Sequence, residues 1–312
     1  RVMNNPLEDR LNLIRSTEAN EGLIFMLYSD PTMHLDKLLS EFTKRTNPLV
    51  SLRDENGITN NVWKLTKQDL QKQITDGLRN KTFYIADGHH RFQTSLLYYQ
   101  ECRKKRWQST ELESFDKRMV ALFNTESPGI RILPTHRGIF NLKDFNLNDF
   151  LSRLNPFFEV QYLQELEELN LALKHQKTGI GLVVGKDDMR LLCLKNRAHK
   201  SADFMPGITG PARRLSVNIL HSGILEPVLG IGTEELASQQ HIQYHRDRNK
   251  LIQFVQENRY QLAFILNPTQ LAQVREISEI GKKMPPKSTD FYPKLLTGLV
   301  MMKMQIKKPT IT

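Results

Sequence analysis

The residues best suited to chemistry in this sequence are the five at positions 87–91 (DGHHR). They follow a short apolar run, residues 83–86 (FYIA), which is typical of a buried strand, and Asp-Gly then favours a turn. Beyond the turn, apolar residues recur at Phe92, Leu96 and Tyr99, a spacing that predicts a helix. We therefore expect a strand, a tight turn and a helix, with two histidines and an arginine in the first helical turn.

Such a helix start suits an anion. The first turn of a helix presents free backbone N–H groups and the positive end of the helix dipole, and Gly88 lets a ligand approach the backbone closely. Arg91 offers paired donors to a phosphate, and His89 and His90 add imidazole donors. Asp87 is also predicted to cap the helix, because its carboxylate can accept from the unpaired N–H groups. The alternative is purely structural: a turn, its cap and polar residues at a helix end.

No zinc site is predicted at this turn, because adjacent histidines point to different sides of a helix and both cysteines lie far away in the sequence. We predict no metal ion that is held by protein ligands alone. Cys102 and Cys193 provide no disulfide framework either, which favours a reducing compartment.

Length and composition bound the class of protein. The 312 residues are enough for one large domain or two ordinary ones, and 39% apolar with 25% charged residues is typical of a globular chain. Lys plus Arg number 44 and Asp plus Glu 34, so the net charge is +10, but the basic residues are scattered. The charge allows an anionic small molecule, a nucleotide or a nucleic acid as partner without choosing among them. No apolar run approaches the length of a membrane span, so no membrane partner is expected.

Hydrophobic periodicity and turn residues predict a mixed α and β chain in three parts. Residues 1–142 form a core domain, residues 143–200 a small α+β subdomain, and residues 201–312 helical and β segments that pack back on the core. The expected helices are 6–20, 32–45, 67–78, 89–104, 146–154, 163–175, 215–225, 232–239 and 269–279. The expected strands are 23–28, 49–53, 58–65, 83–86, 119–123, 132–137, 160–162, 179–184, 189–194 and 262–266, with Asn56-Gly57 as a hairpin turn and 197–211 as a loop.

Two other runs carry side chains suited to an anion. His136 and Arg137 could add cationic contacts to the same ligand, or could belong to a strand end that faces solvent. Lys287, Ser288 and Thr289 lie in a segment too rich in proline for a helix. They could close over a phosphate, or the segment could be a rigid loop that packs through its aromatic residues.

Two further groups have structural explanations at least as good as functional ones. His221 lies on an apolar helix, where we expect a core histidine with satisfied hydrogen bonds. Residues 244–248 (YHRDR) could form a site, and equally a surface cluster of ion pairs.

The motifs at residues 84–91 and 284–295 resemble those of the bacterial and archaeal domain-of-unknown-function family numbered 1015. Supporting matches are residues 133–137 (LPTHR), 225–231 (LEPVLGI) and 263–269 (AFILNPT), and Tyr244 with Asp247. The resemblance runs nearly end to end, and it implies a cytoplasmic protein.

Residues 87–91 are also similar, more distantly, to the phosphate-binding turn of the ParB/sulfiredoxin superfamily, which includes ParB-type CTPases, sulfiredoxins and free-serine kinases. This resemblance implies an α+β fold with a ParB/sulfiredoxin-like N-terminal core and additional C-terminal α/β elements. It implies that His90 and Arg91 contact nucleotide phosphates, with Gly88 in the same cradle, and that Asp87 is the base for a substrate hydroxyl. His89 stands where sulfiredoxins carry their catalytic cysteine, so sulfinic-acid reduction is not expected.

Two departures from these families bear on activity. The kinases use an upstream glutamate, and the His-Glu pair of the larger family is expected to fall just before Arg1. Ser216 and Ser222 stand where that family commonly has carboxylates, around His221. Altered chemistry and surface drift would each explain the two serines.

The leading hypothesis is a nucleotide-dependent phosphotransferase for a small hydroxylated metabolite, with free serine as one candidate acceptor. ATP or ADP is the expected nucleotide, CTP is an alternative, and Mg²⁺ is the expected ion. The other hypotheses are a ParB-like switch that uses CTP or ATP to control binding to DNA or protein, and a degenerate scaffold. Nucleic acid is not favoured, because the sequence has no clear helix-turn-helix and no dense basic arm. The sequence leaves the oligomeric state open.

Overall fold

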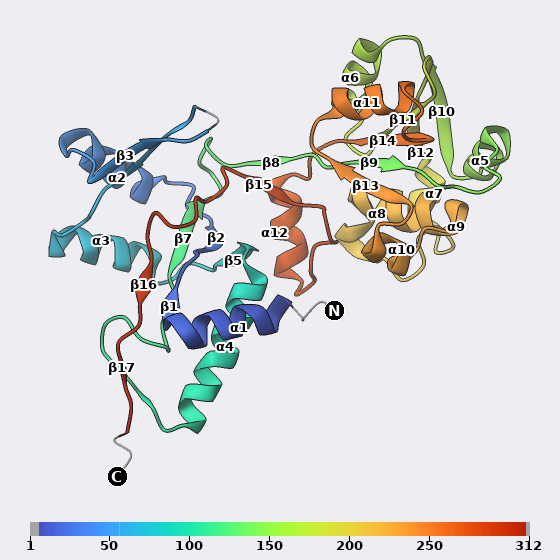
Figure 1. Cartoon of the computed structure of the whole chain (residues 1–312). Helices are drawn as coiled ribbons and strands as arrows, with labels where there is room; N and C mark the ends of the chain where they lie inside the picture. The colour runs from blue at the N-terminus through green and yellow to red at the C-terminus, as the bar shows by residue number, and fades with distance from the viewer. Residues whose placement is uncertain (1–5, 56, 310–312) are drawn as a thin grey trace. The chain divides into compact units, whose positions relative to one another are not determined.

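The computed structural model describes residues 6–55 and 57–309, which divide into two compact units (Figure 1). The first unit combines the chain up to Ile130 with the segment from Pro293 onward, and the second is Arg131–Tyr292. Helices and strands occur in both units, which confirms the mixed α and β class. The three-part division at residues 142 and 200 and the ParB/sulfiredoxin-like core stay predictions.

A three-stranded sheet lies at the centre of the first unit, in the order β5 (Tyr84–Asp87), β2 (Ile24–Tyr28), β7 (Val120–Asn124). The middle strand, β2, runs antiparallel to β5 and parallel to β7. Its sequence IFMLY is apolar, and its burial on both faces matches what such a run favours. The strands predicted at 23–28, 83–86 and 119–123 are confirmed to within a residue or so.

The helices of the first unit alternate with its strands along the chain. They are α1 (Pro6–Thr17), α2 (His34–Arg45), α3 (Gln68–Leu78) and α4 (His89–Lys104). The predicted helices 6–20, 32–45, 67–78 and 89–104 are thereby confirmed, although α1 ends before 20, where a short strand begins. Helix α1 lies against α4 (Figure 1), and both contribute to one small core cluster.

Helix α4 buries a different face from the one that its most apolar residues suggest. Thr94, Tyr98 and Cys102, spaced four residues apart, are its buried residues. Phe92 and Leu96 are 36% and 46% exposed. Both sets of residues have a spacing that places them on one side of a helix. The packing of α4 against α1 determines which of the two sides is buried.

Three pairs of short strands complete the first unit. In the hairpin, β3 (Val50–Arg53) pairs with β4 (Thr59–Val62), as predicted, while Asn56 of its predicted turn lies outside the described residues. The other two pairs tie the C-terminal segment to earlier parts of the chain. They are β1 (Ala19–Asn20) with β16 (Met302–Lys303), and β6 (Gln108–Ser109) with β17 (Ile306–Lys307).

The second unit is built on a six-stranded antiparallel sheet with the order β10-β12-β11-β14-β9-β13. Its strands, in chain order, are β9 (His136–Ile139), β10 (Phe158–Leu163), β11 (Ile180–Val184), β12 (Asp188–Leu194), β13 (Ile242–His245) and β14 (Leu262–Leu266). All five residues of β14 are buried. They alternate between the two core clusters of the unit, because successive side chains of a strand point to opposite faces.

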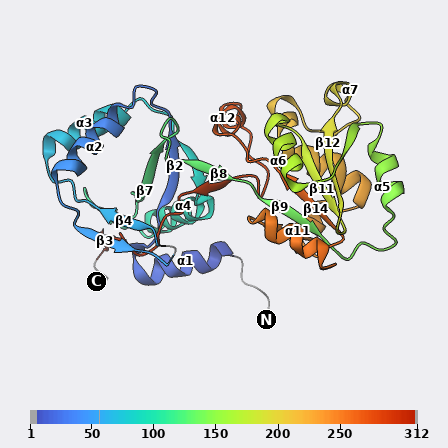
Figure 2. The ribbon, with the colours of Figure 1, turned by 90° about the horizontal axis from the view of Figure 1, so that it is seen from above.

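Helices cover both faces of this sheet (Figure 2). On one face, α6 (Leu166–His175) and α11 (Arg248–Gln256) contribute to the same core cluster. The opposite face packs against α5 (Leu147–Leu154), α8 (Ser216–Leu220) and the π-helical turn His221–Leu225.

Shorter elements fill the rest of the second unit. They are the strand pair β8 (Arg131–Leu133) and β15 (Asp290–Tyr292), the 3-10 helix Gly210–Arg214, and the helices α7 (Asn196–Lys200), α9 (Glu226–Leu229), α10 (Thr233–Ser238) and α12 (Leu271–Glu279). The expected loop at 197–211 is wrong at both ends, where α7 and the 3-10 helix lie. Strand β13 and helix α11 have no counterpart among the predicted elements. Within the described chain, no helix is both long and apolar enough to cross a membrane.

Candidate functional site

The predicted strand, turn and helix of residues 84–104 are present in the first unit. Strand β5 ends at Asp87, Gly88 adopts the left-handed conformation (φ 92°, ψ 20°), and α4 follows for 16 residues. A side chain at position 88 would be strained by this φ, and its Cβ would come within 3.3 Å of the Ile24 backbone. Glycine therefore allows the helix to start directly against the central strand of the sheet.

Asp87 does not cap α4 as predicted. Gly88 is the N-cap residue, and no side chain caps the helix. Instead, the Asp87 carboxylate accepts a hydrogen bond of 3.2 Å from Nη2 of Arg91, and its side chain remains 66% exposed. Because the left-handed residue displaces Asp87 from the cap position, no side chain among the described residues caps the backbone N–H groups of the first turn.

Two arginines beside this turn have N–H groups without acceptors. In Arg118, Nη2 donates to the carbonyl of Gly22 at 2.8 Å, whereas Nε and Nη1 are buried and have no partner among the described residues. The Nε of Arg91 is likewise buried without a partner. Buried N–H groups without an acceptor are costly, so their presence at a helix start indicates a place for an anion.

The electrostatics of this turn point the same way. Burial, and then the positive charges of Arg91 and Arg10, lower the pKa of Arg118 to about 10. The side chain of Arg91 lies over Gly22 and Gly88, because a Cβ on these glycines would approach it to 3.4 and 3.1 Å. A bound anion would relieve both the repulsion between these cations and the missing hydrogen bonds.

His89 and His90 lie exposed in the first turn of α4. The structure thus gathers residues 87–91 at one turn, and adds Arg118, which the sequence pattern does not single out. The one local signal for Arg118 is a basic residue directly before a predicted strand. Its approach to the turn depends on the parallel pairing of β7 with β2.

Arg137 belongs to the second unit and is fully buried. Its Nη2 donates to the Lys287 carbonyl at 3.0 Å, its Nη1 to the Thr135 carbonyl, and its Nε to Nε2 of His221 at 3.3 Å. The expectation of a strand end that faces solvent is therefore wrong. All three guanidinium nitrogens bind protein atoms, and Arg137 holds strand β9 to the loop before β15.

His221 accepts from this guanidinium and is therefore neutral. Burial, reinforced by the charge of Arg137, lowers the pKa of His221 to about 3. His221 is partly buried, and the bond from Arg137 to its Nε2 agrees with the predicted structural role of this histidine. The Cζ atom of Arg137 lies 5.4 Å from the centre of the Tyr244 ring. Tyr244, the first residue of the 244–248 run, therefore packs against this arginine.

Residues 287–289 form an ordered loop in the second unit. Lys287 is left-handed (φ 55°) with its ammonium 5.8 Å from the Tyr244 ring centre. Ser288 is buried and donates to the Pro285 carbonyl at 2.6 Å, while Thr269 donates to the Ser288 carbonyl at 2.8 Å. His136 and Arg137 share this unit with the loop, whereas the turn at 87–91 belongs to the other unit. Contact of residues 136, 137 and 287–289 with a phosphate stays a prediction.

Among the described residues, no group of three or more His, Cys, Asp or Glu side chains could hold a metal ion. Mg²⁺ commonly binds through one or two carboxylates, several waters and substrate phosphates, and so does not require such a cluster.

The family model described as "Protein of unknown function (DUF1015)" matches residues 1–218, so the chain belongs to this family. No curated protein sequence matches it. Three of the similar solved structures illustrate the level of likeness. A mutant free serine kinase in complex with AMP is 12% identical with a TM-score of 0.41, over 93% of this chain and 81% of that one. A conserved hypothetical protein from Pyrococcus furiosus is 12% identical with a TM-score of 0.41, over 95% and 87%. A mutant free serine kinase in complex with ADP is 14% identical with a TM-score of 0.36, over 86% and 83%.

Proposed function

We propose that this DUF1015 protein is a nucleotide-dependent phosphotransferase that acts on a small hydroxylated metabolite, with free serine as a candidate acceptor. The observation that carries the proposal is the set of buried N–H groups on Arg91 and Arg118, beside the left-handed Gly88, that have no partner in the described parts of the chain. These donors lie at the start of α4, where the helix dipole also favours negative charge.

In this proposal the turn at residues 87–91 holds the phosphates of ATP or ADP. Phosphate oxygens would accept from Arg91, Arg118 and the free backbone N–H groups of the first turn, and His89 and His90 would add donors at the exposed side. Each buried donor left without a partner costs roughly 1–3 kcal/mol. Satisfying several of them at once is a substantial source of affinity. Mg²⁺, when bound, would neutralise charge on the phosphates.

Asp87 is the proposed general base. Its carboxylate is exposed at the same turn, where an acceptor hydroxyl can reach it, and it pairs with Arg91 at 3.2 Å. A carboxylate in this place can take the hydroxyl proton while cations stabilise the phosphoryl group under transfer.

Isothermal titration of the chain with ATP, ADP and CTP, each with Mg²⁺, tests the phosphate site. We expect one nucleotide to bind, and Arg91→Ala and Arg118→Met to weaken it at least about tenfold, since each removes a charge-assisted hydrogen bond. Arg103→Met is the matched control, because Arg103 is exposed in the last turn of the same helix. Failure of every nucleotide to bind, or equal losses in the control, would refute the site.

Phosphotransfer is tested separately from binding. With the nucleotide that binds, Asp87→Asn should retain affinity and lose transfer to serine or a related hydroxylated acceptor by at least about a hundredfold. Intact transfer in this variant would disprove the role of Asp87. Tight binding of CTP without any transfer would instead support a nucleotide-controlled switch.

A further inference from the structure

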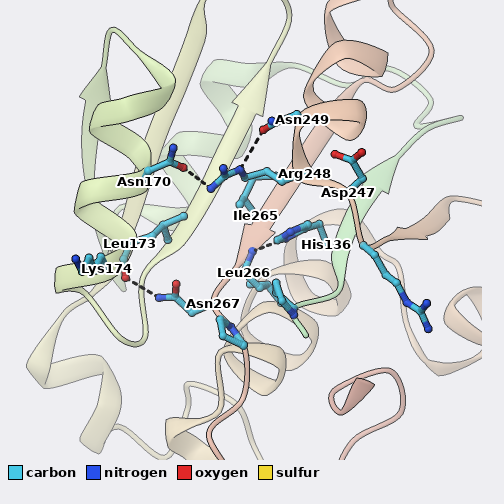
Figure 3. Close-up of a pocket in the computed structure, with 13 residues that line it drawn as sticks. His136, Asn170, Leu173, Lys174, Asp247, Arg248, Asn249, Ile265, Leu266 and Asn267 are labelled. Atoms are coloured by element: carbon cyan, nitrogen blue, oxygen red, sulfur yellow. Dashed lines mark hydrogen bonds between the residues drawn. The ribbon is translucent and has the colours of Figure 1, made fainter. Parts of the chain in front are cut away.

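The second unit contains a pocket of its own, formed by residues outside the turn at positions 87–91. Its volume is about 490 Å³. It lies where β14 ends and β9 begins, between the first turn of α11 and the last turns of α6 (Figure 3). Leu173, Ile265 and Leu266 supply buried apolar walls, whereas His136, Lys174 and Arg248 supply polar groups.

His136 presents a donor to this pocket. It is only 3% exposed, and its Nδ1 accepts from the backbone N–H of Leu266 at 3.2 Å. Burial, and next the charges of Arg137 and Arg248, lower the pKa of His136 to about 4, so the ring is neutral near pH 7. A neutral ring that accepts at Nδ1 carries its proton on Nε2. This Nε2–H has no partner in the part of the chain that the structure describes, although the residue lines the cavity.

Arg248 is held beside His136 with donors to spare. Its Nη1 donates to the side-chain oxygen of Asn170, and its Nε to that of Asn249 at 3.5 Å (Figure 3). Its Nη2 makes no hydrogen bond with the described residues. Both amide partners are neutral, so they orient the guanidinium without cancelling its charge.

The charges around the pocket favour a monoanion. Arg246 is neutralised by its ion pair with Asp290, at 2.5 Å. Asp247 opposes one of the two remaining cations, Arg248 and Lys174, which leaves a net charge of about +1 for a ligand to balance. A carboxylate carries one charge and two coplanar acceptors, whereas a phosphate dianion would leave an excess of negative charge beside Asp247.

We propose that this pocket binds a small carboxylic acid, whose carboxylate accepts from Arg248 Nη2 and His136 Nε2 while its carbon chain packs on Leu173, Ile265 and Leu266. The site does not depend on nucleotide binding at the turn of residues 87–91.

The test uses the full chain and a series of straight-chain carboxylates from acetate to hexanoate, with hexanamide and inorganic phosphate as probes of charge and shape. Binding is followed by NMR, through the ring signals of histidine in protein labelled with ¹⁵N. We expect the longer carboxylates to bind more tightly than acetate and to shift the Nε2 signal of one neutral, Nδ1-acceptor histidine. Hexanamide should bind at least about tenfold more weakly, because it lacks the charge that Arg248 pairs with.

Arg248→Gln should weaken hexanoate about tenfold, and Arg259→Gln, at an exposed arginine outside the pocket, should leave it unchanged. The absence of binding by every carboxylate would overturn the proposal. Equal binding of hexanamide would do the same, since the pocket would then be merely apolar. Preferential binding of phosphate would assign a different ligand class.

Discussion

Arg118 in the first unit and Arg137 in the second each carry a guanidinium group whose pKa burial lowers to about 10. Their donors are used in different ways. All three nitrogens of Arg137 donate to protein acceptors, two of them backbone carbonyls. Two nitrogens of Arg118 are buried with no acceptor among the described residues. A fully buried arginine whose donors are satisfied supports the fold, whereas a partly exposed arginine with two buried donors that lack acceptors indicates a ligand.

The two units that contain these arginines also differ in the size of their sheets and hydrophobic cores. The second unit has a six-stranded sheet with a core cluster on each face. The first has a three-stranded sheet, and the core cluster between α1 and α4 contains six buried residues. A unit with the smaller core gains more, relative to its own stability, from a ligand that binds only the folded state.

The largest effect is expected for Arg137→Leu, which leaves two carbonyls and His221 without their donor. Loss of one side of a buried polar network costs about 3–5 kcal/mol of unfolding free energy. Chemical unfolding followed by circular dichroism should show this loss. Trp63 and Trp107, the two tryptophans of the chain, lie in the first unit, so their fluorescence transition should move less. An unchanged circular-dichroism transition would show that Arg137 does not support the fold.

Acid should destabilise the second unit through two of its histidines, His136 and His221. The pKa values of His136 and His221 are lowered to about 4 and about 3 in the folded chain, against an ordinary value of 6.5. Above pH 6.5 both states hold these rings neutral, and the stabilisation is complete. As the pH falls from 6.5 toward 4, the unfolded chain takes up protons first, so the unfolding free energy declines. We expect roughly 2 kcal/mol per histidine between pH 7 and 5.

Unfolding titrations at pH 7, 6 and 5 measure this decline. The circular-dichroism midpoint should fall with pH more steeply than the tryptophan midpoint. Arg137→Leu removes the charge next to His221 and should make the dependence shallower. Equal slopes for both probes would show that these histidines do not set the acid sensitivity of the second unit.

Arg118→Met should have the opposite profile to Arg137→Leu. Methionine removes two buried donors that have no acceptor within residues 6–55 and 57–309, along with one bond to Gly22, so the unfolding free energy should change by less than about 1 kcal/mol. Nucleotide affinity should still fall at least about tenfold, or about 1.4 kcal/mol. Titration and tryptophan-monitored unfolding of the same sample check both halves. A large loss of stability with unchanged affinity would make Arg118 a second structural arginine.

Local patterns were sufficient to predict the elements around the candidate site. An apolar run, an Asp-Gly pair and a helical repeat act within a few residues, and β5, Gly88 and α4 lie where these signals put them. Strand β13 and helix α11 were not predicted, and their structure depends on the pairing of β13 with β9 and the packing of α11 on the sheet. Tertiary context decides such segments.

The chemistry of individual side chains was harder to predict, because it depends on distant partners. Arg118 meets the turn only through the parallel pairing of β7 with β2, which residue spacing does not reveal. Arg137 is a residue type that commonly binds anions, but one of its N–H groups donates to the backbone carbonyl of Lys287, 150 positions later. The cap predicted for Asp87 failed because Gly88, in its left-handed conformation, takes the cap position.

The smallest effects are expected for exposed arginines that already have an ion-pair partner, one in each unit. Arg79 pairs with Asp76 at 2.8 Å and is 69% exposed, and Arg259 pairs with Glu257 at 2.9 Å and is 63% exposed. Water screens such pairs, so Arg79→Ala and Arg259→Ala should each change the unfolding free energy by less than about 0.5 kcal/mol and leave nucleotide affinity unchanged. The same unfolding and titration experiments measure both. Suppose that either change lowered the unfolding free energy as much as Arg137→Leu. An ion pair would then stabilise the fold equally whether the arginine is exposed or buried, and the contrast between Arg118 and Arg137 would lose its physical basis.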